Sequence, residues 1–223
     1  MSRVYLLVEG QTEEAFVQEL LAPHFLPQGV FLIPIIVRTG QGFRGGKVTY
    51  AQLRRQLVGL CRQEPGVTVS TMFDLYALSD DFPGKQSAGY PVKGSGRQKA
   101  QYLEQQWAQD VGERNFVPNL LVHEFEALLF AGTERFADWT DGETVAALAE
   151  VARAHGCPED INDHPQTAPS KRLLAAMPAY RKAFHGPLIA CDIGLEGMRQ
   201  ACPHFHAWLC QLEALVSSSN LNP

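Results

Sequence analysis

Residues 4–16 read V-Y-L-L-V-E-G-Q-T-E-E-A-F, and this stretch decides the fold that we expect. Its first five residues form an uninterrupted apolar run, which predicts a strand buried on both faces, as in parallel α/β sheets. Gly10 permits a tight turn, and Thr12 predicts the N-cap of a helix over residues 12–23. Glu9 is therefore expected at the carboxyl end of the first strand, where open α/β sheets bind their ligands.

A second acid lies close to Glu9 in this arrangement. Glu13 falls in the first turn of the expected helix, from which its carboxylate is able to face the same crevice. Two carboxylates aimed at one point repel each other unless a cation or a proton lies between them. The pair favours a divalent metal ion. The alternative is that Glu9 only ends a strand, while Glu13 and Glu14 favour the helix dipole.

The bulk composition limits the class of protein. A chain of 223 residues with 45% hydrophobic content is able to bury a full core as one domain, or as one domain with an extension. No apolar run approaches the ~20 residues that span a bilayer, and the first run is too short for a signal peptide, so we expect a cytoplasmic protein without membrane contact. The five cysteines are odd in number and contain no C-x-x-C, which indicates neither a disulfide framework nor a cysteine zinc site.

The net charge of −5 argues against a protein that depends on non-specific phosphate contacts, because such proteins are usually basic. Contact with nucleic acid must then be local, metal-assisted or shared with a partner. One local cationic segment is residues 38–47, which holds four glycines and the cations Arg38, Arg44 and Lys47. It lacks the spacing of a nucleotide P-loop, and it either wraps an anion or is an ordinary surface loop.

More carboxylates follow the ends of later strands. Residues 30–37 predict a second strand, in which Pro34 indicates a sheet edge or a bulge. After a predicted helix over residues 50–62, residues 67–78 contain a third buried strand that ends in Asp74, followed by Asp80 and Asp81. Residues 116–122 predict a fourth strand, and H-E-F-E follows it with Glu124 and Glu126. Three strand ends therefore carry acids.

The remainder of the chain is mostly helical in character. Residues 141–155 predict a helix, and residues 186–191 predict a short final strand. In residues 168–174, Ser170 is expected to cap a helix whose first turn holds Lys171 and Arg172. Cations there oppose the helix dipole, so they either bind an anion or are ordinary solvated charges. A zinc site at Cys202, His204 and His206 is disfavoured, because helix positions i and i+2 diverge.

The V-E-G-x-T-E motif, the aspartate on a later strand and the basic loops resemble the Toprim fold. This fold is the nucleotidyl-transfer and hydrolysis module of primases, type II topoisomerases and overcoming-lysogenization-defect nucleases. The chain more closely resembles the bacterial Toprim-like family known as domain of unknown function 4276. The motifs that carry this resemblance span nearly the whole chain and are V-E-G-Q-T-E-E, F-D-L-Y-A-L-S-D-D-F-P-G, H-E-F-E-A-L-L-F, A-P-S-K-R-L and C-P-H-F-H-A-W-L.

This resemblance implies roles for the acids. Glu9 matches the first-strand glutamate, which is a metal ligand or general base, and Glu13 matches the second glutamate of the motif. Asp74 matches the first aspartate of D-x-D. Tyr76 stands where the second aspartate belongs, and a tyrosine is no substitute for a carboxylate on magnesium. Either of two acids, Asp80 or Asp81, fills that place, or one metal site is absent.

The last carboxylate of the expected set is either Glu124 or Glu126. Mg²⁺, or Mn²⁺ in its place, would combine these carboxylates with substrate phosphates and water. Two such ions ~4 Å apart would stabilise both the attacking and the leaving oxygen of a phosphodiester. The residue expected to assist as a catalytic lysine is Lys171, and the cations expected to hold phosphates are Arg38, Arg44, Lys47, Lys171 and Arg172.

The expected fold is α/β, with a Toprim-like (Rossmann-like), mainly parallel sheet flanked by helices over residues 1–131. A mostly helical extension over residues 132–223 returns one strand. The expected function is a Mg²⁺-dependent phosphodiester hydrolase acting on DNA or RNA. Relatives encoded beside AAA or SMC-type ATPases imply the effector of an ATPase-coupled phage-defence system. The alternatives are a non-catalytic Toprim-like module that binds such an ATPase or a nucleotide-like ligand, and metal-dependent transfer on a small phosphorylated substrate.

Overall fold

A computed structural model describes residues 2–40, 43–44, 48–161, 164 and 166–219. In chain order the elements are β1 (Ser2–Val8), α1 (Gln11–Phe16), η1 (Val17–Leu21), α2 (Ala22–Phe25), η2 (Leu26–Gln28), β2 (Val30–Ile36), β3 (Arg38–Gly40), β4 (Phe43–Arg44), α3 (Tyr50–Gln63), β5 (Thr68–Asp74), η3 (Leu75–Ala77), α4 (Gly96–Val111), β6 (Phe116–Val117), β7 (Leu120–Leu121), α5 (Glu126–Leu129), η4 (Phe130–Asp138), α6 (Gly142–His155), η5 (Pro158–Asp160), α7 (Pro169–Ala176), α8 (Lys182–Ile193), α9 (Leu195–Ala201) and α10 (Pro203–Ser219).

The strands form a parallel sheet with the order β2-β1-β5-β6, and β7 pairs with β5 beyond the end of β6. This confirms the predicted mainly parallel α/β fold. Pro34 lies in β2 at the sheet edge, where a missing backbone donor is tolerated. The predicted strand over residues 116–122 is divided into β6 and β7, with Pro118 between them.

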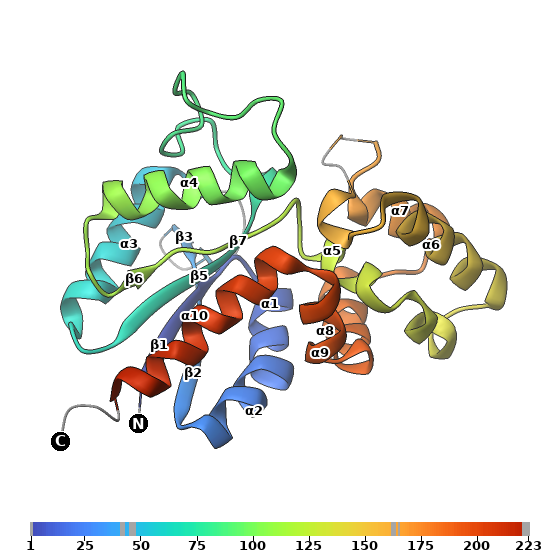
Figure 1. Ribbon diagram of the computed structural model, residues 1–223, viewed down its shortest axis with the longest axis horizontal. Helices are drawn as coiled ribbons and strands as arrows, with labels where there is room; N and C mark the ends of the chain where they lie inside the picture. Colours follow the sequence, from blue (N-terminus) through green and yellow to red (C-terminus); the bar gives the residue numbers. More distant parts are fainter. Residues whose placement is uncertain (1, 41–42, 45–47, 162–163, 165, 220–223) are drawn as a thin grey trace.

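Helices cover both faces of the sheet (Figure 1). On one face, α3 and α4 pack over Leu7 and Phe73 of the sheet, and α4 contributes Trp107 to the same hydrophobic cluster. On the other face, α1 continues through the π-helical η1 into α2, and α10 runs alongside. Trp208 of α10 donates from Nε1 to Ser70 Oγ of β5 at 2.9 Å, which ties the C-terminal helix to the sheet.

The C-terminal half packs against the sheet as well as against itself. One hydrophobic cluster runs from Val4 and Leu6 of β1 through Phe125 to Leu209 and Leu212 of α10. A continuous core of this kind indicates that residues beyond 131 contribute to folding of the sheet, while the domain boundary at residue 131 remains a prediction. None of the helices in the described ranges has the length and apolar character needed to cross a membrane.

Three local predictions were wrong. Residues 186–191 lie inside helix α8 and form no returning strand, because a short apolar run does not distinguish a buried helix from a buried strand. The first helix begins at Gln11 with Gly10 as its N-cap, and Thr12 is buried inside it. Helix α7 has Ala168 as its N-cap and Pro169 in its first turn, so Ser170 lies within the helix.

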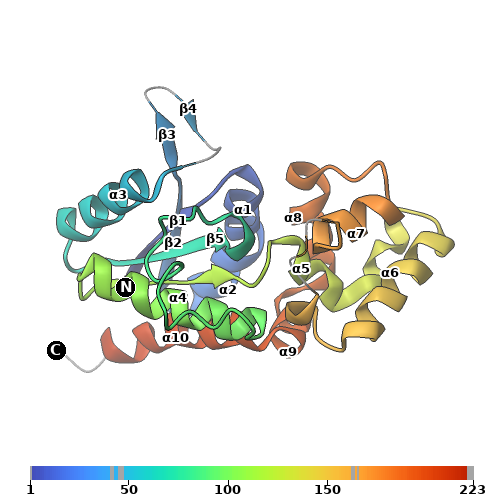
Figure 2. The same ribbon diagram turned by 90° about the horizontal axis from the view of Figure 1, so that it is seen from above.

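The cationic segment that follows β2 contains the antiparallel hairpin of β3 and β4. Because β1, β2 and β5 are parallel, this hairpin begins at the carboxyl ends of the strands, where Glu9 and Asp74 also lie. Figure 2 shows it projecting from the body of the protein beside α3. Its base is fixed by Gln56 of α3, whose side chain exchanges two hydrogen bonds of 2.9 Å with the backbone of Arg38.

Candidate functional site

A lysine joins carboxylates from three separate elements at the carboxyl edge of the sheet. Lys182 Nζ, at the start of α8, lies 3.2 Å from Asp74 Oδ2 of β5 and 3.6 Å from Glu13 Oε1 of α1. It also lies 3.4 Å from Glu126 Oε2 of α5. The three acids are buried, while 38% of the lysine side chain is exposed. The cluster therefore opens to solvent on the side of Lys182.

Backbone N–H groups hold the acids in place. Gly10 donates to Glu13 Oε2 at 3.0 Å, so the turn after β1 and the first turn of α1 fix this carboxylate. Asp74 Oδ1 accepts from the backbone N of Phe125 at 2.8 Å. Glu9 Oε2 accepts from the backbone N of Asp74 at 3.5 Å, which brings the ends of β1 and β5 together.

The segment after β7 turns sharply to present two further acids. His123 has a φ of 66°, a left-handed conformation that is uncommon outside glycine, and its carbonyl accepts from Tyr76 N at 2.9 Å. Beyond this turn, Glu124 Oε1 accepts from the backbone N of Ser170 at 2.5 Å. Both Glu124 and Glu126 are buried, so the structure brings both of the alternatives to the site.

Close packing of α8 makes the position of Lys182 possible. A Cβ atom at Gly186, one turn after Lys182, would lie 3.1 Å from a ring carbon of Phe125 and 3.1 Å from the Tyr180 hydroxyl. The bare backbone of glycine therefore lets α8 approach α5. The Tyr180 hydroxyl is directed at Glu126 Oε1, at 3.5 Å.

Burial controls the electrostatics of this site. Burial, together with the charges of Asp74 and Glu13, raises the pKa of Glu9 to about 7. Burial also raises the pKa of Glu126 to about 7 against the opposing effect of Lys182. Burial alone would lower the pKa of Lys182, but the carboxylates outweigh it, so this pKa lies above its usual value and the lysine is charged. The buried carboxylates repel one another, and a nearby cation reduces this repulsion.

The donor set fits a divalent metal ion. Asp74, Glu124 and Glu126 each offer a carboxylate oxygen, and these atoms lie within 4.8 Å of one another. Within the described part of the chain, no group donates a hydrogen bond to the buried Glu126 Oε2, although Lys182 lies nearby. Hard cations prefer such oxygen ligands. The buried acidic triad is therefore compatible with metal binding.

Two predicted acids lie elsewhere. Asp80 is exposed, and its Oδ1 lies 3.4 Å from Lys85 Nζ. Asp81 is also exposed and accepts a 2.5 Å hydrogen bond from Ser79. Tyr76, in the place of the missing aspartate, is 46% exposed. The triad that the described residues form contains none of these three.

The predicted phosphate-binding cations have mixed positions. Arg38 lies at the base of the β3–β4 hairpin and is exposed. The side chain of Arg44, like all of Lys47, lies outside the described residues. Lys171 is exposed and follows Ser170, whose backbone binds Glu124, so it lies near the rim of the site. Arg172 is half-buried and donates from Nε to the carbonyl of Thr167 at 2.7 Å.

Sequence patterns did not identify Lys182 as a site residue. Its helix was predicted to contain a strand, and no local motif joins residue 182 to residue 74. The only signal in this region is a pair of cations, Arg181 and Lys182, directly before an apolar run. In the region of Cys202, His204 Nε2 pairs with Glu104 Oε1 at 2.8 Å, and His206 Nδ1 accepts a hydrogen bond from Arg199 Nε.

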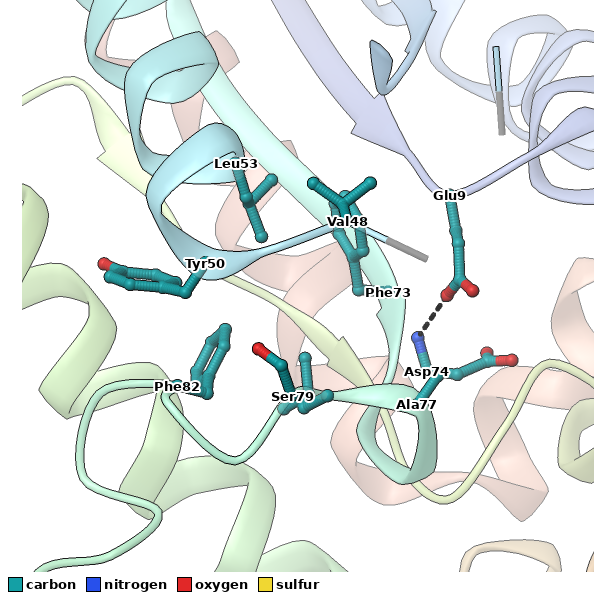
Figure 3. Close-up of a pocket in the computed structure, with 10 residues that line it drawn as sticks. Glu9, Val48, Tyr50, Leu53, Phe73, Asp74, Ala77, Ser79 and Phe82 are labelled. Carbon is teal, nitrogen blue, oxygen red and sulfur yellow. Dashed lines mark hydrogen bonds between the residues drawn. The ribbon is translucent and has the colours of Figure 1, made fainter. Parts of the chain in front are cut away.

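A pocket adjoins the acidic cluster and shares two of its residues. Glu9 and Asp74 form one wall (Figure 3). The other residues that line it come from α3, the end of β5 and the segment after it, and they are Val48, Tyr50, Leu53, Phe73, Ala77, Leu78, Ser79 and Phe82. The site therefore combines a charged half and a mainly apolar half.

Solved structures resemble this chain, and a family model matches its sequence. The C-terminal region of the Burkholderia pseudomallei OLD protein is similar in structure, with a TM-score of 0.49 and 15% identity over 97% of this chain and 99% of that chain. The C-terminal region of the Xanthomonas campestris pv. campestris OLD protein has a TM-score of 0.41 and 15% identity over 99% and 98% of the two chains. No curated protein matches the sequence significantly. The family described as "Domain of unknown function (DUF4276)" matches residues 8–213, so the chain belongs to this family.

Proposed function

We propose that this protein is a divalent-metal-dependent phosphodiester hydrolase that acts on nucleic acid. The observation that carries the proposal is the convergence of Asp74, Glu124 and Glu126, with ligand atoms within 4.8 Å of one another. These acids come from different elements, and burying them together is costly without a cation. Folds retain such costly arrangements at functional sites.

The carboxylates of the triad would hold Mg²⁺ or Mn²⁺ in this proposal. A bound divalent ion polarises a phosphoryl oxygen and makes water a better nucleophile. Glu9, whose pKa of about 7 lies near neutral pH, is suited to accept a proton from the attacking water. Lys182 is charged and half-exposed beside Asp74, so it is suited to bind a non-bridging phosphate oxygen and stabilise the charge that develops there.

Cations around the site would bind the flanking phosphates. Arg38 lies on the hairpin at the same sheet edge, and Lys171 follows the residue that binds Glu124. We include Arg44, Lys47 and Arg172 in this role, as the sequence predicts. Local cations together with a bound metal allow a chain of net charge −5 to bind a polyanion.

The direct experiment compares wild type with Asp74→Asn on plasmid, single-stranded DNA and tRNA, in Mg²⁺, in Mn²⁺ and in EDTA. We expect metal-dependent cutting that Asp74→Asn loses by at least about 100-fold, since transition-state charge stabilisation of this kind contributes that much. The matched control is Asp138→Asn, which changes an exposed aspartate and should keep full activity. Circular dichroism establishes that all proteins fold. Cutting that persists in EDTA or in Asp74→Asn would overturn the proposal.

A second candidate function is a non-catalytic module that binds a partner ATPase or a nucleotide-like ligand. Two observations favour it: Tyr76 replaces a carboxylate, and Lys182 already places a positive charge among three acids. The proposal that an AAA or SMC-type ATPase partners this chain in phage defence applies to both functions. Co-purification with an ATPase encoded beside it, together with cleavage assays on the complex, separates them. A stable complex that cuts nothing favours the second candidate.

A further inference from the structure

The pocket beside Glu9 and Asp74 offers a surface unlike that of the acidic cluster. The partners of Lys182, such as Phe125 and Tyr180, pack in the core on the α1 and α10 face of the sheet. Most of the pocket walls belong to the core on the α3 and α4 face, and the exceptions are the two acids, Ala77 and Ser79. The pocket and the cluster are thus neighbours that meet at two carboxylates.

The apolar walls are held rigidly. Phe82 packs edge-to-face against Tyr50 at a centroid distance of 5.3 Å and against Trp107 at 5.0 Å. The Tyr50 hydroxyl is engaged by Asp110 at 2.5 Å, so this ring contributes mainly apolar surface to the pocket. Figure 3 shows the Glu9 carboxylate and the backbone N of Asp74, joined by a hydrogen bond, on one side of the pocket, with the Ser79 hydroxyl between them and the Tyr50 ring.

We infer that this pocket receives the base of the nucleotide next to the scissile phosphate, so that the substrate of the proposed hydrolase is unpaired at the point of cleavage. The inference rests on the proposed function. A nucleobase is a flat ring with two apolar faces and polar edges, which matches rigid apolar walls with a carboxylate and the Ser79 hydroxyl at the rim. A phosphate attached to that base would lie toward the cluster, because Glu9 and Asp74 belong to both.

Other occupants fit less well. An anionic group is repelled by the two carboxylates in the wall unless a metal ion separates them. A base stacked and paired within a duplex is unable to enter a side pocket without being extruded, which costs unstacking energy. Single-stranded nucleic acid, or an unpaired end, avoids that cost. We therefore assign the substrate class as single-stranded DNA or RNA.

The test uses a single-stranded oligonucleotide whose cleavage position has been mapped. Each nucleotide around the cut is replaced in turn by an abasic one. We expect one position at which loss of the base lowers kcat/KM by about 5- to 150-fold, the range that one stacked base contributes. Ala77→Phe places a ring at the exposed edge of the pocket. This variant should cleave the intact oligonucleotide with the kcat/KM that wild type has for the abasic oligonucleotide. Its kcat/KM for the abasic oligonucleotide should equal that of wild type. Ala137→Phe, at an exposed alanine that does not line the pocket, is the matched control and should behave as wild type.

The outcomes separate this inference from the proposed function. Cleavage that is equally fast on duplex and single strand, or insensitive to every abasic substitution and to Ala77→Phe, overturns the pocket assignment and leaves the hydrolase intact. If wild type cuts no nucleic acid, the hydrolase proposal fails. Fluorescence anisotropy of the labelled oligonucleotide in Ca²⁺ then tests, without cleavage, whether the pocket binds a base. Binding that is weakened by one abasic position and by Ala77→Phe supports it, and any other result overturns it.

Discussion

Lys182 Nζ lies 3.2 Å from Asp74 Oδ2, although 108 residues separate the two in the chain. The lysine also contacts Glu13 and Glu126, so a residue of the C-terminal half balances the charge of acids from the sheet and from two other helices. The contact makes the helical extension part of the site itself.

Removing this lysine should destabilise the metal-free protein. Lys182→Met leaves three buried carboxylates without their counter-charge, and we expect the free energy of unfolding in EDTA to fall by about 1–3 kcal/mol. This is less than the loss for a fully buried pair, because 38% of the lysine side chain is exposed. Mg²⁺ should restore more stability to the variant than to wild type. Urea unfolding with and without Mg²⁺ measures both effects. Lys171→Met, at an exposed lysine, should change neither, and an equal loss in this control would contradict the assignment.

Removing one buried acid should have the opposite effect on stability. Burial raises the pKa of Glu126 to about 7, which means that its charged form is disfavoured in the folded protein. Glu126→Gln should therefore raise the free energy of unfolding at about pH 8 in EDTA by about 1–3 kcal/mol. The same variant should lose the rise in Tm that Mg²⁺ produces in wild type. Glu134→Gln, at an exposed position, should keep that rise and leave stability unchanged. A Mg²⁺-dependent rise in Tm for Glu126→Gln equal to that of wild type would remove Glu126 from the metal site.

The pair of His204 and Glu104 should make stability depend on pH. Burial lowers the pKa of His204, but the hydrogen bond and the charge of Glu104 raise it by more, so it lies above its ordinary value of 6.5. The folded protein then binds this proton more tightly than the unfolded chain does. The stabilisation is fully present below about pH 6.5 and is lost as the pH rises through the raised pKa.

Glu104→Gln removes the partner charge and should flatten this dependence between about pH 6 and about pH 8. Glu159 and Arg97 also face His204, and the acids of the candidate site titrate in the same pH range. The informative quantity is therefore the slope of the free energy of unfolding against pH in wild type minus the same slope in the variant. Chemical unfolding at several pH values in EDTA measures it. His206→Gln, on the exposed side of the same helix, should keep the wild-type slope. Equal slopes for wild type and Glu104→Gln would contradict the assignment.

Two glycines in helices should respond oppositely to alanine. A Cβ atom at Gly96 would lie 2.7 Å from ring atoms of His123 and 2.7 Å from Val122 Cγ1, so Gly96→Ala pushes the turn that presents Glu124. We expect a loss of about 1–3 kcal/mol, as for overpacking in a core. Gly59 in α3 has no atom within 4 Å of such a Cβ among the described residues, so Gly59→Ala should stabilise by about 0.5–1 kcal/mol. Thermal unfolding compares the two, and a Gly96→Ala variant as stable as wild type would show that the turn adapts.

The sequence predicted those features that depend on local pattern. Mainly apolar runs identified β1, β2 and β5, and Glu9 and Asp74 lie as predicted at the carboxyl ends of β1 and β5. Pro34 correctly marked the edge strand, because a missing donor leaves a local trace. Glu124 and Glu126 were recognised as alternatives, but their joint presence in the site depends on the turn at His123, for which no residue type gives a signal.

The features that escaped prediction depend on contacts between distant segments. The apolar run at residues 186–191 fits a strand or a helix equally, and the packing of Gly186 against Phe125 decides for the helix. Because a strand is predicted for that segment, the helix that carries Lys182 is not predicted from the sequence. Ser170 was expected to cap a helix with its side chain, whereas its backbone N binds Glu124. Periodicity carries no information about which distant carboxylate a given lysine or amide will meet.

The late position of Lys182 has a consequence during translation. A nascent polypeptide that has emerged only as far as α7 already holds Glu9, Glu13, Asp74, Glu124 and Glu126, but not the cation that joins three of them. The ribosome must release α8 and the helices after it before these acids gain their partner. Synthesis itself therefore delays completion of the site until α8, which carries Lys182, has been made.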